Sequence, residues 1–342
     1  MKLITNTANT FFTTQMQHLK FGCFALLLPL NVLAQQVDFS KQQIQDDVTL
    51  TFQWQNKQSE IQNLSFKESG KAFFQPFRNF RAYNAESAQR TIVKKTLALW
   101  REQPVANVQL SVSRQSGNHD FSLQARDDES LNKAQVHLRK LSAQAQNDYL
   151  KQRYYHIFTR YDGVKAIKPD HIRIAEESVP LFSALKPTIL EIVELRNIRK
   201  VTNYSLNFIQ SIPYSPLESR VTSAGAGFVP PMQVLYQNQG DCDSKVTLTT
   251  SLLRNLMPRI EMIMIFIDGH ALMGINAPIQ GGDFTLSHNG ITYVLAEPTG
   301  PATLPLGKIS PESELAIQAG MYTVEEFHSQ ADEAMTSSAG EE

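Results

Sequence analysis

Three residues in the second half of the chain, Cys242, His270 and Glu297, are of the types that carry out nucleophilic catalysis. In such a site a cysteine thiolate attacks a carbonyl carbon, an imidazole moves the proton, and a carboxylate orients the imidazole. The three residues occur in the order thiol, imidazole and acid, each beside a segment whose pattern predicts a helix or a strand. Residue type and order therefore indicate a candidate Cys-His-acid site.

Cys242 is the only cysteine that we expect in the mature protein. The other, Cys23, lies within residues 1–34, which end in a short apolar run with Val32 and Ala34 at the small-residue positions of a cleavage site, as in a secretory signal peptide. We therefore expect export to the periplasm or the medium, and no intramolecular disulfide. The competing interpretation of a single unpaired thiol is a buried cysteine that packs as a small apolar side chain.

The residues that follow Cys242 predict that it begins a helix. Asp241 or Asp243 is a suitable N-cap, and the partial positive charge of a helix N-terminus, with Lys245 one turn on, favours thiolate over thiol. Aspartates on both sides also argue against burial in the apolar core, so the surroundings favour the nucleophile. The apolar stripe of this helix consists of Val246, Leu248, Leu252, Leu253 and Leu256.

His270 and Glu297 each lie just after a predicted strand. The first strand is nearly continuous in apolar residues, as is typical of a central strand. The second is the far arm of a hairpin whose turn is Asn289-Gly290, a pair typical of a type I′ turn. The first strand spans 260–267 and continues after a bend over 271–275, and the hairpin arms span 284–288 and 291–295.

The residues around these positions resemble the transglutaminase-like superfamily over roughly residues 180–310. Residues 240–245, Gly-Asp-Cys-Asp-Ser-Lys, are similar to its nucleophile motif, and Gly-His-Ala at 269–271 is similar to its histidine strand. Residues 293–299, Tyr-Val-Leu-Ala-Glu-Pro-Thr, resemble its acid strand. Upstream, residues 208–214, Phe-Ile-Gln-Ser-Ile-Pro-Tyr, resemble the segment that precedes the cysteine in bacterial transglutaminase-like cysteine peptidases.

The resemblance implies a papain-like α+β fold, in which a helix bearing the cysteine packs on an antiparallel sheet bearing the histidine and the acid. It implies Cys242 as nucleophile, His270 as general base and acid, and Glu297 as the orienting carboxylate. Gln210 would be an oxyanion-hole donor beside the backbone N–H of Cys242. Many members have Asp in place of Glu297, and Ser244 also departs from the family pattern with no role that we can assign. No cofactor and no metal are implied.

Local alternatives remain open at this level. Gln210 is equally well explained as a solvated helix residue. Asp268 is a rival for the orienting acid, although we expect it to point away from His270 because neighbouring residues on a strand alternate in direction. A metal site at Cys242 and its flanking aspartates is a further alternative, but consecutive residues rarely converge on one ion.

The chain ahead of these motifs predicts a separate small α+β unit with no cluster of chemical groups. Its predicted strands are 48–54, 61–66, 108–112 and 121–123, and its helices begin at Asn84 and at about Asp128. A break in the helical pattern over 163–169 suggests a boundary. The division is then a signal peptide (1–34), an N-terminal α+β domain of unassigned role (35–165), a catalytic domain (166–320) and a tail (321–342).

Composition limits the class of partner. The chain has 342 residues, of which 42% are hydrophobic and 19% charged, and its formal net charge is -1. It can therefore bury a core but offers no excess of basic charge for nucleic acid or an anionic membrane, and after signal removal no apolar run is long enough to span a bilayer. Its oligomeric state is not indicated.

The expected activity is hydrolysis of amide bonds in protein or peptide substrates through a thioester intermediate. Transfer of the acyl group to an amine, which would cross-link proteins, uses the same residues and stays open. A third interpretation is a transglutaminase-like binding module whose triad is not used.

Overall fold

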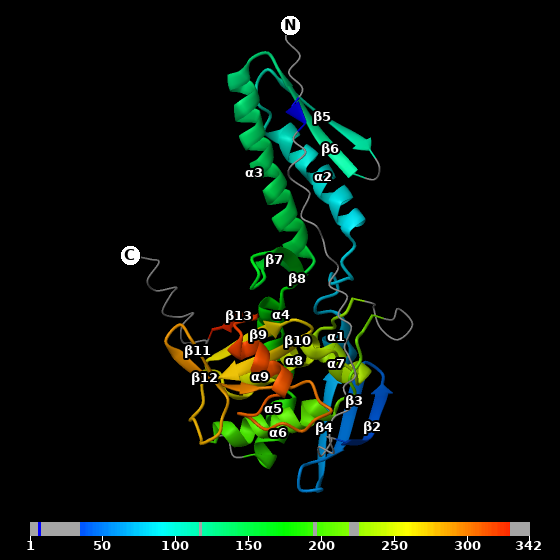
Figure 1. Ribbon diagram of the computed structural model, residues 1–342. Coiled ribbons are helices and arrows are strands. Elements are labelled where there is room, and N and C mark those ends of the chain that lie inside the picture. The colour runs from blue at the N-terminus through cyan, green and yellow to red at the C-terminus, as the bar shows by residue number, and fades with distance from the viewer. Residues whose placement is uncertain (1–5, 8–34, 116–117, 194–196, 219–225, 329–342) are drawn as a thin grey trace, which may run out of the picture. The chain divides into compact units, whose positions relative to one another are not determined.

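The computed structural model describes residues 6–7, 35–115, 118–193, 197–218 and 226–328, and their fold is mixed α and β (Figure 1). The predicted signal residues, apart from 6–7, and the end of the predicted tail lie outside these residues. The chain forms two compact units. Among the described residues, the smaller unit consists of 6–7, 79–159 and 165–169, and the larger of 35–78, 160–164 and 170–328.

The smaller unit is built on two long helices that pack against each other. α2 (Ala85–Glu102) and α3 (Asp128–Gln152) begin at Asn84 and Asp127, whose side chains accept the N–H groups of Ser87 and Ser130. The strands are β1 (Asn6–Thr7), β5 (Val108–Gln115) and β6 (Asn118–Ala125) in one sheet, and β7 (Tyr155–Thr159) and β8 (Lys165–Pro169) in another. The predicted helices and the β5–β6 hairpin are thus confirmed.

The centre of the larger unit is a five-stranded antiparallel sheet in the order β11-β12-β10-β9-β13. The predicted type I′ turn is confirmed, because Asn289 and Gly290 have φ values of 46° and 80°. The strands are β9 (Met262–Ile267), β10 (His270–Ile275), β11 (Thr285–His288), β12 (Ile291–Ala296) and β13 (Tyr322–Phe327). β13 falls in the predicted tail, so that prediction was wrong for residues 322–327.

Both faces of this sheet are covered, which explains the continuous apolar run of β9. Met262 and Met264 belong to the core around α8 (Cys242–Leu256), whereas Ile263 and Ile265 pack with Ile317 of α9 (Pro311–Gln318). α8 contacts β9 and β10, and its helical neighbours include α4 (His171–Ser178), α6 (Ile198–Ser211) and α7 (Pro231–Gln237). A short 3₁₀ helix (Val179–Phe182) and α5 (Leu185–Ile192) complete the helical side.

A second sheet in the larger unit overturns the predicted domain boundary. It consists of β2 (Gln35–Ile44), β3 (Asp47–Gln55) and β4 (Ile61–Ser69), and α1 (Gly70–Phe74) follows it. The rings of Phe52 and Trp54 each lie 5.1 Å from that of Phe208 in α6, and Trp54 Nε1 donates to Asn207 Oδ1 at 2.6 Å. Residues 35–78 therefore belong with the unit that holds α8, and not with a separate N-terminal domain.

None of the helices in the described ranges combines the length and the apolarity that crossing a lipid bilayer requires.

Gly274, the residue before the last of β10, leaves no room for a larger side chain. A Cβ added there would lie 2.7 Å from Ile263 Cγ1 and 2.9 Å from Tyr293 Cβ. Because overpacking a core costs about 1–3 kcal/mol, we expect Gly274→Ala to lower the free energy of unfolding in urea by about that amount. Gly281→Ala is the matched control, because nothing lies within 4 Å of its added Cβ. Equal stability of the two variants would contradict this packing.

Candidate active site

Cys242 is the first residue of α8, as predicted. Asp241 is the N-cap, and its carboxylate accepts the N–H of Ser244 at 3.0 Å. Burial and the charge of Asp243 raise the pKa of Asp241 well above its usual value. Cys242 is 6% exposed and belongs to the apolar core around α8, so the expectation that its flanking aspartates keep it out of that core was wrong. It lies at the positive end of a 15-residue helix.

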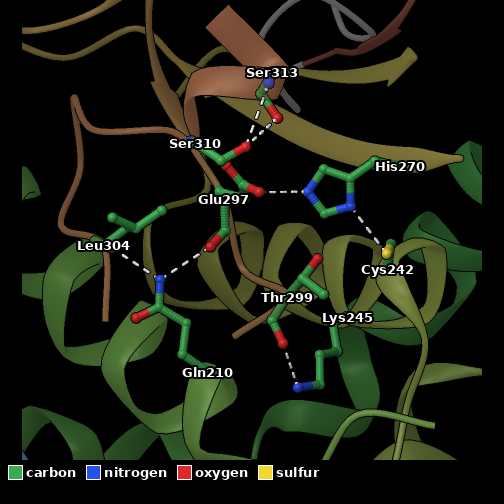
Figure 2. Close-up of polar contacts among 9 residues, drawn as sticks. All are labelled: Gln210, Cys242, Lys245, His270, Glu297, Thr299, Leu304, Ser310 and Ser313. Carbon is green, nitrogen blue, oxygen red and sulfur yellow. Dashed lines mark hydrogen bonds and ion pairs between the residues drawn. The ribbon is translucent and has the colours of Figure 1, made fainter. Parts of the chain in front are cut away.

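His270 is the first residue of β10 and lies between Cys242 and Glu297 (Figure 2). Its Nδ1 is 2.9 Å from Cys242 Sγ, and its Nε2 is 2.5 Å from Glu297 Oε1. The tight turn before it includes Gly269, whose φ of 74° favours glycine. The structure thus brings the three predicted residues together in the order that a triad requires.

Glu297 follows directly after the last residue of β12, and its carboxylate has two partners. Oε1 meets His270, and Oε2 accepts the N–H of Ser310 at 2.7 Å. Ser310 is the N-cap of α9, so the carboxylate lies near the positive end of a second helix. The side chain of Glu297, one methylene longer than that of Asp, reaches the imidazole.

The pKa shifts of His270 and Glu297 have opposite signs. Burial alone would lower the pKa of His270, but the hydrogen bonds and negative charges of Cys242 and Glu297 outweigh it and raise the pKa well above its usual value. Burial alone would raise the pKa of Glu297, but His270 and the hydrogen bonds from Ser310 lower it. At neutral pH the arrangement therefore favours a protonated His270 imidazole beside an ionised Glu297 carboxylate.

Gln210 has different partners from those expected of an oxyanion donor. It is buried, and its Nε2 donates to the carbonyl oxygens of Glu297 at 2.9 Å and Leu304 at 2.8 Å. Figure 2 shows the Gln210 amide directed at the carbonyl groups of Glu297 and Leu304, and not at Cys242. Because both amide protons are already donated, Gln210 has none left for an oxyanion in this arrangement. It is also not a solvated helix residue.

Lys245, one turn along α8, is buried beneath the site. Its Nζ donates to the carbonyl oxygens of Ile212 and Thr299, each at 2.5 Å. Burial lowers the pKa of Lys245 to about 7, although the charges of Cys242 and Asp241 oppose the shift. The sequence placed Lys245 near the thiol, but did not show that its ammonium is bound to two backbone carbonyls.

Asp268 does not bind His270, but the reason expected from the sequence was wrong. It lies in the turn between β9 and β10, and not on a strand. There it accepts a hydrogen bond from Tyr161 Oη at 2.6 Å and pairs with Arg160 Nη2 at 3.4 Å. These two partners, which the sequence did not indicate, hold the carboxylate of Asp268.

Ser244, Ser310 and His171 are neighbours of the site whose roles the sequence did not reveal. Ser244 Oγ accepts the N–H of Val229 at 2.9 Å and so fixes the segment before α7. His171 is buried between aromatic rings, with its Nε2 3.5 Å from Asp243 Oδ2. Ser310 followed by proline is a helix-start signal that could have predicted α9.

Within the described parts of the chain, no group of three or more His, Cys, Asp and Glu side chains could hold a metal ion.

We expect Glu297→Gln to slow the acylation of Cys242 by an activated ester by about 10–100-fold. Glutamine still accepts a hydrogen bond but removes the charge, and a hydrogen bond to a charged group contributes about 1.5–3 kcal/mol, at about 1.4 kcal/mol for each tenfold in rate. Since Glu297 helps to raise the pKa of His270, the alkaline fall in rate should move to lower pH. Stopped-flow measurement from pH 5 to 10 checks both effects, and an unchanged profile would exclude Glu297 from the site.

Comparisons with protein-family models, with curated proteins and with solved structures gave no match for this chain.

Proposed function

We propose that this chain is an exported, papain-like cysteine hydrolase of the transglutaminase-like type, which cleaves amide bonds of protein or peptide substrates. The observation that supports it most is the continuous contact from Cys242 Sγ through the His270 imidazole to the Glu297 carboxylate, at 2.9 and 2.5 Å. These residues come from a helix N-terminus, a strand start and a strand end, which is the arrangement expected of a papain-like domain.

The first half of the reaction forms a thioester. The Cys242 thiolate attacks the carbonyl carbon of the substrate, and the C–S bond forms as the carbonyl π electrons move to oxygen. His270 then donates its Nδ1 proton to the amide nitrogen, the C–N bond breaks, and an amine leaves. Glu297 stays ionised and stabilises the imidazolium that stands next to it.

The second half releases the acid. His270, now neutral, takes a proton from water, and the hydroxide oxygen attacks the thioester carbon. The C–S bond breaks, a carboxylic acid leaves, and the thiolate and imidazolium are restored. The backbone N–H of Cys242, at the open end of α8, is the oxyanion donor in both halves, because N–H groups in the first turn of a helix have no partner within the helix.

Product analysis tests the proposed reaction. The protein is incubated with a defined peptide mixture in H₂¹⁸O, with and without an added alkylamine, and the products are examined by mass spectrometry. Hydrolysis predicts new carboxyl groups that carry one ¹⁸O, even when the amine is present. Products joined to the amine would indicate acyl transfer. Unchanged peptides, with no acyl adduct on Cys242, would favour a binding module.

A further inference from the structure

The segment from Glu297 to Leu304 carries the candidate acid but belongs to no strand or helix. β12 ends at Ala296, so the hydrogen bonds of the sheet do not fix the position of Glu297. Three carbonyl oxygens of this segment, those of Glu297, Thr299 and Leu304, are instead bound by two buried side chains (Figure 2).

Gln210 and Lys245 reach this segment from two different helices. Gln210 lies in the last turn of α6 and binds the Glu297 and Leu304 carbonyls, and Lys245 lies in the first turn of α8 and binds the Thr299 carbonyl. The second acceptor of Lys245 is Ile212 O, at the end of α6. The two side chains therefore bind the segment to α6 and α8 at once.

Burying the Gln210 amide and the Lys245 ammonium costs free energy of folding. An ammonium at 0% exposure loses its hydration, and carbonyl dipoles compensate for it only in part. Gln210 Oε1 is also buried with no hydrogen-bond partner. An apolar core at these positions would avoid both penalties, but it would leave the carbonyls of the segment without donors.

Gly300 brings the segment against α6. Its φ is 66°, and a Cβ at this position would lie 2.2 Å from Gln210 O. Only glycine permits this close approach. The backbone of the segment and the end of α6 are therefore in direct contact next to the hydrogen bonds of Gln210.

We propose that Gln210 and Lys245 are positioning residues, which hold the Glu297–Leu304 segment so that the Glu297 carboxylate meets His270. This inference rests on the proposed function, because it concerns the acid of the same site. Neither side chain touches the reacting atoms. Each acts through the backbone of the segment that carries Glu297.

The cleanest test is Gln210→Met, which keeps side-chain size and neutrality but removes both donors. Iodoacetamide alkylation of Cys242 is measured from pH 5 to 9 on the full chain, and the proton on His270 Nε2 is observed by ¹H NMR. We expect alkylation at pH 6 to fall about tenfold relative to the unchanged protein. The Nε2 proton signal should move upfield, because its hydrogen bond to Glu297 lengthens.

Lys245→Met is the second variant, and it should change both readouts in the same direction. It removes the donor to Thr299 O and Ile212 O, which binds the middle of the segment to the end of α6.

Each variant has a matched control on α8, away from the site. Asn255 Nδ2 donates to Val179 O at 2.9 Å, so Asn255→Leu also removes a side-chain amide that binds a backbone carbonyl. Arg254 is 2% exposed and donates to the carbonyls of Pro258, Ile260 and Phe327, so Arg254→Met also removes a buried cation. Both controls should lose stability but keep the alkylation profile and the Nε2 signal of the unchanged protein.

The outcomes separate this inference from the proposed function. Folded Gln210→Met and Lys245→Met proteins with unchanged profiles and an unchanged Nε2 signal would overturn it. The inference would also be overturned if both variants unfold while both controls fold, because the two side chains would then stabilise the whole unit. If Cys242 of the unchanged protein is alkylated with the pH dependence of an ordinary thiol, the proposed function fails. The Nε2 proton signal of His270 still decides whether Gln210 positions Glu297.

Discussion

Cys242→Ala should remove acyl-enzyme formation entirely and lower hydrolysis to below about 10⁻⁴ of the original rate. The reason is that the proposed reaction has a single covalent intermediate, on the sulfur of Cys242. Cys242 is the free cysteine of the described residues, so a thioester there is identified by one modified peptide in mass spectrometry.

Cys242→Ser is the companion variant. A hydroxyl in this position is a far weaker nucleophile, because its proton is lost much less readily than that of a thiol. It should retain the fold, as judged by urea unfolding, and form no detectable acyl adduct. Hydrolysis by either variant at more than a few per cent of the original rate would show that another group attacks the substrate.

His270→Ala should lower the rate of acyl transfer by about 10³-fold. General acid–base catalysis by a positioned side chain contributes about 10²–10⁴-fold, and His270 is the proposed proton carrier in both halves of the reaction. Pre-steady-state kinetics with a chromogenic amide measures the effect, because an amide leaving group needs the proton more than an activated ester does.

His288→Ala is the matched control for that variant. His288 pairs with Glu326 at 3.0 Å and also loses an imidazole–carboxylate contact when it is changed. It should retain the full rate of acyl transfer. Normal acylation of the His270 variant, or equal losses in the two variants, would remove His270 from the mechanism.

Much of the site could be predicted because short stretches of sequence determine where its helix and strands begin and end. The cap at Asp241 and the apolar stripe after it specify where α8 begins, and therefore place Cys242 at the helix N-terminus. The Asn289-Gly290 turn and the apolar run of β9 specify the strands that end near Glu297 and begin at His270.

The rest depended on packing that no short segment encodes. Alternation in β3 predicts that Trp54 is buried, but not that it packs on α6, and for that reason the predicted domain boundary was wrong. Gln210 lies 87 residues from Glu297 in sequence, and only the fold determines whether its amide faces a carbonyl or the thiol. Asp268 likewise depends on the distant Tyr161.

The pH dependence of Cys242 alkylation tests the central claim most directly. An ordinary thiol with a pKa of about 8.5 loses reactivity nearly tenfold for each pH unit below that value. In the proposed reaction Cys242 attacks as a thiolate beside a protonated His270, and the pKa of His270 is raised well above its usual value. We predict that the rate with iodoacetamide changes by less than about threefold between pH 8 and pH 6, whereas a fall of about 10²-fold would contradict a paired thiolate at Cys242.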